Sequence, residues 1–175
     1  MAGVGYDAVA VKLLHRVRRT RPGALLYRLP RGADCLYLIA GLLALFRFRP
    51  VRVAAELDAQ PRVTGLASVS VLNTAQYAKR WSVVPSALAH DGVFDTREER
   101  GAFFLRPLCA LIAAMLRRRA PAFIARYGRA TRVVLHAPRA FAWQLDGDAM
   151  SPAARLDVTL RAAFFDLVVP ARSTG

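Results

Sequence analysis

The sequence predicts a mainly β fold, an antiparallel β-sandwich with a few helices, from three observations. Most apolar segments are short, rich in β-branched and aromatic residues, and bounded by Gly, Pro or Asp, as strands are. Some alternate polar with apolar residues, as Ser68 and Ser70 do with Val69 and Val71, which indicates half-buried strands. Two longer apolar segments have the length and composition of helices.

The first predicted helix runs from Cys35 to Phe46, with Asp34 as its N-cap. Its apolar run is well short of the roughly 20 residues that span a bilayer, so we expect a buried helix, with an interfacial helix between flanking arginines as the alternative. The second runs from Phe103 to Arg119 and ends in a basic turn that suits its dipole. Strands are expected at VRVAAEL from Val51, LASVSVLN from Leu66, TRVVLHA from Thr131, AFAWQL from Ala140, ARLDVTLR from Ala153 and FFDLVVP from Phe164.

Length and composition predict one globular domain over residues 1–175. The net charge of +14 favours an anionic partner, either a membrane surface or a nucleic acid. Near an anionic bilayer each basic residue contributes roughly 1 kcal/mol to binding. Cys35 and Cys109 lie in apolar runs, so we expect buried core thiols in a reducing cytoplasm.

The segment WQLDGDAMSP joins an apolar strand to two carboxylates. Asp146-Gly147 is first a hairpin signal, because Asp-Gly supports the positive φ angles of tight turns. Asp148 adds a second charge two residues on, and two repelling carboxylates are seldom placed together merely to turn the chain. The following residues lack the further acidic ligands of an EF-hand loop. A turn and a site therefore both stay open.

Two further segments carry acidic and glycine residues. VVPSALAHDGVFD places Asp91 before Gly92, which fits either a hairpin or a cation site in which a carboxylate and backbone carbonyls supply the oxygens. AGVGYDA, near the start of the chain, has two glycines before Asp7, but no third glycine follows at dinucleotide-binding spacing.

In this order, the three segments resemble the C-terminal part of the bacterial lipid kinase and diacylglycerol kinase family, whose relatives include sphingosine and ceramide kinases. AGVGYDA is similar to the family's Gly-x-Gly-Phe-Asp stretch, and SVLNTAQYAKRWSVVPSALAHDGVFD to its Asn, Tyr, Pro-x-Ala and Asp-Gly segment. WQLDGDAMSPAARLDVTLRAAFFDLVVP resembles its Gln-x-Asp-Gly-Glu motif, followed by two strands ending in Val-Pro. The resemblance covers most of the chain.

The resemblance implies the β-sandwich domain of a two-domain lipid kinase, with a lipid entering near the cleft between the domains. By it, Asp146 is the general base that takes a proton from a lipid hydroxyl during phosphoryl transfer from ATP, and Asp148 is the second catalytic carboxylate. Asp91 binds Mg²⁺ with the carbonyls of Leu88 and Val93. Asp7 faces the lipid head group.

The sequence departs from the family pattern in three places. Asp148 replaces the family's Glu and is one methylene shorter, and AKRW stands where glycines usually follow the Tyr of the middle segment. The family's Gly-Gly-Asp-Gly-Thr phosphate loop occurs nowhere in the 175 residues. We therefore expect a fragment without the N-terminal nucleotide-binding domain, inactive alone because phosphoryl transfer depends on positioned phosphates and metal.

The resulting expectation is a peripheral protein at the cytoplasmic face of the membrane, with the segment ADCLYLIAGLLALFRFR as a candidate contact. The alternative is a non-catalytic basic module that binds anionic membrane or nucleic acid. No nucleic-acid-binding motif is visible, so nucleic acid is not the expected partner. A degenerate, inactive remnant is a third interpretation, and self-association into a homodimer stays open.

Overall fold

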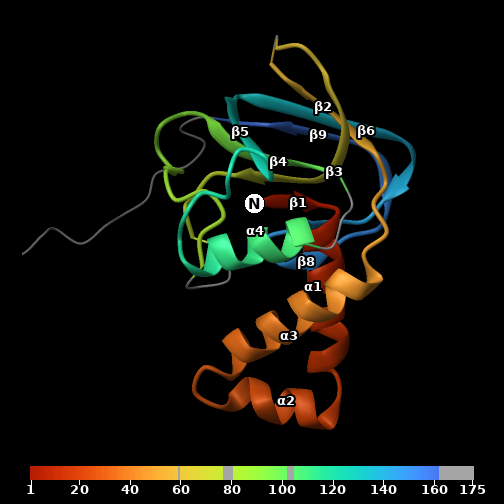
Figure 1. Ribbon diagram of the computed structural model, residues 1–175, viewed down its shortest axis with the longest axis vertical. Coiled ribbons are helices and arrows are strands. Elements are labelled where there is room, and N and C mark those ends of the chain that lie inside the picture. The colour runs from red at the N-terminus through yellow and green to blue at the C-terminus, as the bar shows by residue number, and fades with distance from the viewer. Residues whose placement is uncertain (59, 77–80, 102–104, 162–175) are drawn as a thin grey trace, which may run out of the picture.

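The computed structural model describes residues 1–58, 60–76, 81–101 and 105–161. In this part of the chain nine strands form one antiparallel sheet, and four helices accompany it (Figure 1). The predicted mainly β, antiparallel fold is confirmed. The strands are β1 (Ala2–Val4), β2 (Val53–Leu57), β3 (Val63–Leu72), β4 (Phe94–Arg100), β5 (Ala125–Ala130), β6 (Arg132–Phe141), β7 (Trp143–Leu145), β8 (Asp148–Ala149) and β9 (Ala153–Thr159). The helices are α1 (Tyr6–Arg18), α2 (Arg21–Arg28), α3 (Gly32–Arg47) and α4 (Leu105–Met115).

The strand order brings the start of the chain beside a late hairpin. The main path of the sheet runs β8-β7-β1-β3-β2-β6-β9, while β4 pairs with β3 and β5. β2 and β1 pair one after the other along the same edge of β3: Leu66 pairs with β2, and the segment from Val69 to Val71 pairs with β1. The other side of β3 pairs with β4. β1 therefore lies in the interior of the sheet, with β7 as its second neighbour.

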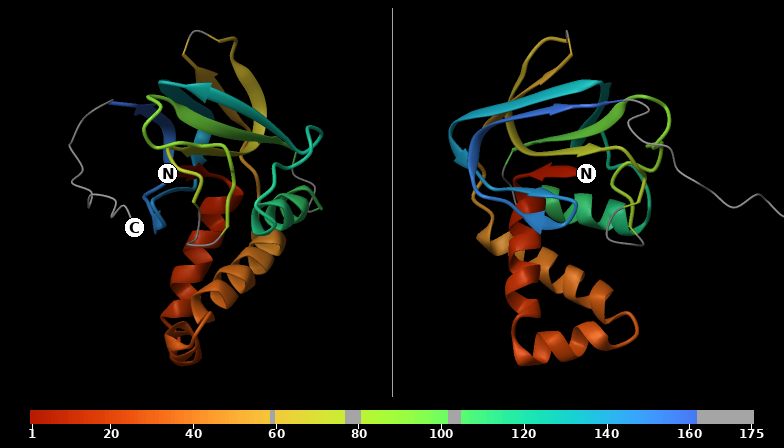
Figure 2. Two further views of the ribbon diagram at one scale, coloured as in Figure 1. Left: turned by 90° about the vertical axis from the view of Figure 1, so that its left-hand side faces the viewer. Right: turned by 180° about the vertical axis from the view of Figure 1, so that it is seen from behind.

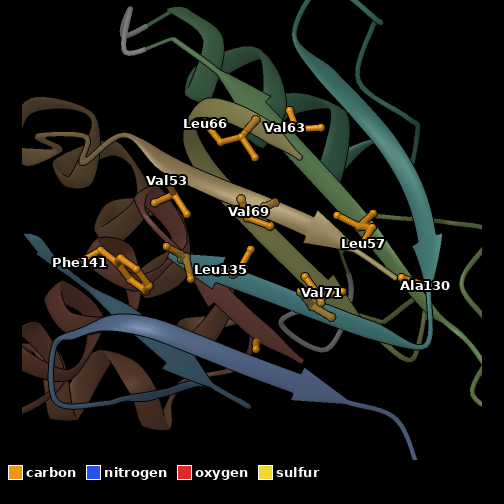
Figure 3. Packing of buried hydrophobic residues seen from close by; sticks show 13 residues of the cluster. Val53, Leu57, Val63, Leu66, Val69, Val71, Ala130, Leu135 and Phe141 are labelled. Carbon is orange, nitrogen blue, oxygen red and sulfur yellow. The ribbon is translucent and has the colours of Figure 1, made fainter. Parts of the chain in front are cut away.

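The main core lies inside the curl of this sheet. Side chains from β2, β3 and β6 meet there, and Figure 3 shows them converging. Fully buried members are Val53, Leu66, Val69, Val71, Leu135 and Phe141. Burial of apolar surface of this kind is the dominant favourable term in folding.

Three helices form an arm that projects from the sheet. Figure 2 shows α1 and α3 descending together, with α2 joining them at the far end. Leu13 and Leu14 of α1 pack on Leu36 and Ala40 of α3 in a second core. The Thr20 Oγ1 accepts a hydrogen bond of 3.2 Å from the Gly23 N–H and so caps α2.

The predicted helices are confirmed in place, with corrections at their ends. α3 begins at Gly32, so Asp34 lies in its first turn and is not its N-cap. The second helix is described from Leu105 and ends at Met115, ahead of the basic residues 117–119, so the predicted basic last turn was wrong. Residues 103 and 104 lie outside the described residues. No helix in the described part of the chain combines the length and hydropathy needed to cross a bilayer.

Most predicted strands are confirmed, and three expectations were wrong. The strands expected from Thr131 and Ala140 are largely one strand, β6, and only the segment from Trp143 forms β7. β3 is buried on both faces over most of its length, because the helices cover the serine face that we expected to be exposed. Cys35 and Cys109 are exposed, since each lies on the outer side of its helix. The strand expected from Phe164 lies outside the described residues.

Candidate functional site

The first strand and the turn after it place Asp7 against the sheet. Gly3 of β1 lies opposite Gln144 of β7. Gly5 then turns the chain into α1 with a φ of 89°, a conformation that favours glycine. A Cβ at Gly5 would also lie only 2.3 Å from the carbonyl oxygen of Ala67. The second glycine of AGVGYDA therefore sets Asp7 in the first turn of α1, beside the sheet.

A buried hydrogen bond joins Asp7 to β7. The Gln144 Nε2 donates to the Asp7 Oδ2 at 2.6 Å, between residues that are 137 positions apart in the sequence. Gln144 is only 1% exposed, and Asp7 is buried as well. The other end of the same amide is also used, because the Gly147 N–H donates to the Gln144 Oε1 at 2.8 Å. Gln144 thus connects Asp7 to the turn that carries Asp146.

Asp146 and Gly147 form the tight hairpin between β7 and β8. Both have positive φ angles, 47° and 93°, as the residues of such a hairpin require. The hairpin interpretation is therefore confirmed. The Asp146 carboxylate is largely exposed and accepts a hydrogen bond from the amino group of Met1.

The same turn borders a polar cavity of about 250 Å³. Asp146, Gly147 and Gln144 line it together with Asn73 and Thr74, which follow β3. Asp146 therefore lies at a turn and at the rim of a cavity, so the two interpretations of the motif are compatible.

Asp148 points to a different partner from Asp146. Its side chain is 83% exposed, and its Oδ1 lies 4.0 Å from the His15 Nε2 on α1. Asp148 does not line the cavity beside Asp146. The two carboxylates of the motif thus have different neighbours, the amino group of Met1 for Asp146 and the His15 ring for Asp148.

The Asp91 segment forms a separate acidic site. The Asp91 Oδ2 accepts a hydrogen bond from the Arg129 guanidinium, and its Oδ1 accepts one of 3.3 Å from the Val93 N–H. Asp91 and Leu88 line a cavity of about 490 Å³, whereas Val93 is not part of its lining. This cavity shares no described lining residue with the one beside Asp146. The structure thus links Asp7 to Asp146 through Gln144 and leaves Asp91 apart.

Asp95 adds a second carboxylate to the cavity beside Asp91. Its side chain is buried, and within the described chain its Oδ2 has no hydrogen-bond partner. Burial raises the pKa of the Asp95 carboxyl, against the opposing effect of Arg129. Carboxylate and carbonyl oxygens are the ligands that Mg²⁺ prefers, so these residues fit such an ion. Because the described residues contain no cluster of three or more Asp, Glu, His or Cys side chains, an ion here would also need carbonyls or water.

A third, smaller cavity lies between the sheet and the helices. It measures about 50 Å³, and most of its lining is apolar, including Tyr37 and Leu111. Its polar lining includes Asp7, Arg97 and Glu99, the last two of which form a buried ion pair. Burial raises the pKa of the Glu99 carboxyl, against the opposing effect of Arg97.

Comparison with known protein families identifies the fold's relatives. The model of the family described as YegS C-terminal NAD kinase beta sandwich-like domain matches residues 1–162. The chain belongs to this family. The match confirms the resemblance, recognised in the sequence, to the C-terminal domain of bacterial lipid kinases. Among proteins with curated descriptions, none matches the sequence.

Two solved structures with a similar fold are proteins of Bacillus anthracis. A candidate diacylglycerol kinase has a TM-score of 0.55 and 14% identity over 71% of this chain and 44% of its own. A diacylglycerol kinase of the same organism has a TM-score of 0.51 and 10% identity over 92% of this chain and 46% of its own. At these identities the similarity establishes the fold. The chain matches less than half of the length of either protein.

Sequence reasoning missed three groups that the structure places at these sites. Gln144 was only part of a motif, yet its amide links Asp7 to the turn. Asp95 was noticed only as the end of a segment. Arg97 and Glu99 lie in the segment FDTREER, whose charges hid a buried strand. Because Thr96 and Glu98 between them are polar as well, the segment shows no polar and apolar alternation that could have predicted a buried strand.

Proposed function

We propose that the chain is the substrate-binding and catalytic-base domain of an ATP-dependent lipid kinase, which transfers phosphate to a lipid hydroxyl as a diacylglycerol kinase does. The observation that carries this proposal is the link from buried Asp7 through Gln144 to the Asp146 turn. It joins two of the family's acidic motifs beside one cavity. Membership of the YegS C-terminal domain family and the fold of the diacylglycerol kinases support it.

In this proposal Asp146 is the general base. An aspartate carboxylate is ionised at neutral pH and accepts the proton of a lipid hydroxyl while the hydroxyl oxygen bonds to the γ-phosphorus of ATP. The bond from that phosphorus to the bridging oxygen breaks, and ADP leaves. Gln144 acts as a positioning residue, because its Oε1 accepts the N–H of Gly147.

Asp7 is proposed to face the lipid head group, and Asp148 to be the second catalytic carboxylate. Asp7 lines the cavity between sheet and helices, which has Val11 and Tyr37 in common with the cavity beside Asp146. A lipid at these two residues would therefore lie between Asp7 and the proposed base. Since Asp148 is highly exposed and does not line this cavity, we expect a smaller effect from its loss than from that of Asp146.

The proposed metal ligands are Asp91, the carbonyls of Leu88 and Val93, and, from the structure, Asp95. A Mg²⁺ ion there would neutralise carboxylate charge and order the segment after Asp91. Asp91 would exchange its contact with Arg129 for the ion. ATP is proposed to bind mainly to a nucleotide-binding domain, and the anionic inner face of the cytoplasmic membrane is the proposed location.

The test is lipid phosphorylation by this chain joined to the nucleotide-binding domain of a family member. Transfer of the γ-phosphate of ATP to diacylglycerol in detergent micelles is measured. Asp146→Asn is expected to lower the rate about 10²- to 10⁴-fold, because the amide cannot take up the proton. Asp157→Asn on β9 removes an exposed carboxylate away from the cavity and serves as the control. Full activity of Asp146→Asn would exclude Asp146 as the base.

A further inference from the structure

Helix α4 is apolar on two opposite sides. The buried side consists of Pro107, Ala110, Leu111 and Ala114, which face the rest of the domain. The opposite side consists of Leu105, Cys109, Ile112 and Leu116, which are all exposed. Their spacing of four, three and four residues places these four side chains in one line along the helix and the turn that follows it. We call this line the outer stripe.

The loop after α4 holds an aromatic side chain, Phe123, in solvent. Ala120 and Ile124 are buried against Ala110 of α4 and anchor this loop. The Ile124 N–H donates to the Pro121 carbonyl oxygen at 2.8 Å and closes a turn. Phe123, within that turn, is 74% exposed. Because the buried residues Ala120 and Ile124 anchor the chain on either side of Phe123, the fold of the loop keeps the Phe123 ring exposed.

Beside this loop lies a cavity of about 760 Å³ with strong positive charge. Arg100, Arg106, Arg119 and Arg126 line it together with Phe123, and its described lining contains no carboxylate. Two of the four arginines are held in position. Arg106 donates to the Arg100 carbonyl oxygen at 2.5 Å, and Arg119 donates to the Ser86 Oγ at the same distance. Guanidinium groups in such a cluster suit phosphate oxygens.

The cavity flanks the outer stripe. Arg106 follows Leu105 directly and so lies about 100° further around the helix, between the exposed and the buried sides of α4. An apolar line and a cationic cavity that adjoin in this way match the two chemistries of a bilayer interface, acyl chains and anionic head groups. A nucleic acid would use the arginines but leave the outer stripe in water. A second copy of the chain would bring another +14 of charge toward the first.

We propose that the outer stripe, Phe123 and the four-arginine cavity together dock the domain on an anionic bilayer, with a lipid phosphate in the cavity. This docking proposal rests on the proposed function, which gives the protein an anionic membrane as its partner, and it names the surface that contacts that membrane. It assigns the contact to α4 and the loop after it, whereas the sequence suggested the segment that forms α3. Figure 1 shows α4 beneath the sheet and apart from α2 at the far end of the arm.

Vesicle binding by the chain tests this proposal without ATP. Cosedimentation is measured with phosphatidylcholine vesicles and with equimolar phosphatidylcholine and phosphatidylglycerol. We expect binding only to the anionic vesicles, weakened by added salt. Arg106→Gln with Arg126→Gln should weaken it about 30-fold, as expected for two cationic side chains near an anionic surface. Phe123→Ser should weaken it about tenfold, because the ring no longer enters the interface.

Matched variants elsewhere on the surface control for charge and hydrophobicity. Arg139→Gln with Arg155→Gln removes two exposed arginines from β6 and β9, and Phe46→Ser removes an 87% exposed ring from α3. Both should bind nearly as the unaltered chain does, and circular dichroism checks that all variants are folded. Undiminished vesicle binding by the Arg106 and Arg126 pair and by Phe123→Ser would overturn the proposal, as would larger losses in the controls.

Two further measurements distinguish the membrane from other partners of this surface, and distinguish docking from phosphoryl transfer. Loss of RNA binding or of self-association in these variants, with unchanged vesicle binding, would assign the surface to that partner and overturn the proposal. Asp146→Asn should bind vesicles normally. The docking variants, joined to a nucleotide-binding domain, should phosphorylate micellar diacylglycerol at the normal rate. Failure of docking and failure of the kinase proposal therefore give different results.

Discussion

At the scale of single residues, the absence of a side chain at Gly3 shapes the site. A Cβ on Gly3 would lie 2.0 Å from the Asp7 Oδ2 and 2.7 Å from the Gln144 Nε2. Both distances are far shorter than any van der Waals contact. The hydrogen bond between Asp7 and Gln144 therefore passes directly over the glycine, and this close approach accounts for the first glycine of the Gly-x-Gly pair.

Gly3→Ala is expected to lower the free energy of unfolding by about 1–3 kcal/mol, as overpacking in a filled interior does. Denaturant unfolding followed by circular dichroism measures this. In the double variant with Asp7→Ala the clashing carboxylate is gone, so the two losses should be less than additive. Strictly additive losses would show that the methyl group is accommodated without moving Asp7.

Glu98 is a buried charge with an unsatisfied oxygen. It lies on β4, and within the described chain its Oε2 has no hydrogen-bond partner. Burial raises the pKa of the Glu98 carboxyl, against the opposing effects of Arg126 and Arg100. A pKa raised on folding means that the folded state binds the proton more tightly than the unfolded state does. The charged form therefore lowers stability at neutral pH, and this cost disappears as the pH falls through the folded-state pKa.

Glu98→Gln should accordingly be more stable than the unaltered chain at neutral pH. The difference should shrink on acidification and level off below the ordinary glutamate pKa of about 4.3, where Glu98 is protonated in both the folded and the unfolded state. Urea unfolding at a series of pH values measures it, with the partly exposed Glu56→Gln as the control. A stability difference that does not change with pH would show that the charge of Glu98 is not its cause.

At the scale of elements, α3 is an apolar helix with one buried side and one exposed side. Leu36, Ala40 and Ala44 are buried against α1, while Leu42 and Phe46 are exposed. The buried members follow a spacing of four residues and form one side of the helix. The apolar run was visible in the sequence, but nearly every position in it is apolar, so the pattern could not say which side would be buried.

Leu36→Ala is expected to lower the free energy of unfolding by about 2–5 kcal/mol, because it leaves a cavity between α1 and α3. Leu42→Ala removes the same number of atoms from the exposed side and should change it by less than about 0.5 kcal/mol. Thermal and denaturant unfolding of the two variants measure both values. Similar losses in the two would mean that the outer side of α3 is covered in solution.

At the scale of the whole molecule, the net charge of +14 acts against the compact state. Arginines lie on both the helices and the sheet, and most are exposed. Their mutual repulsion acts through solvent and is screened as the Debye length falls to about 8 Å at physiological ionic strength. The few described ion pairs, such as Arg132 with Asp157, leave most of this charge unopposed.

The melting temperature should therefore rise when sodium chloride is added to a low-salt buffer. The variant with Arg139→Gln and Arg155→Gln carries two fewer charges and should show a smaller rise. Differential scanning calorimetry of both proteins over a salt series measures the effect. A melting temperature that falls with salt would indicate that attractive ion pairs outweigh the repulsion.

The sequence by itself determined the features that depend on neighbours along the chain. The Asp-Gly hairpin formed as predicted because its positive φ angles are a local preference. Alternation and β-branched content found most strands, and three acidic motifs in order identified the family. The roles of Asp7, Asp146, Asp148, Asp91, Leu88 and Val93 rest on that resemblance and stay predictions.

Only the tertiary structure decided which distant residues meet and which side chains lose water. Gln144 reaches Asp7 because β1 lies between β7 and β3. The charged β4 is buried, and the cysteines are exposed, because burial depends on what packs against a residue rather than on its own polarity. The outer side of α4 became visible in the same way, since only the packed domain shows which of its two apolar sides remains uncovered.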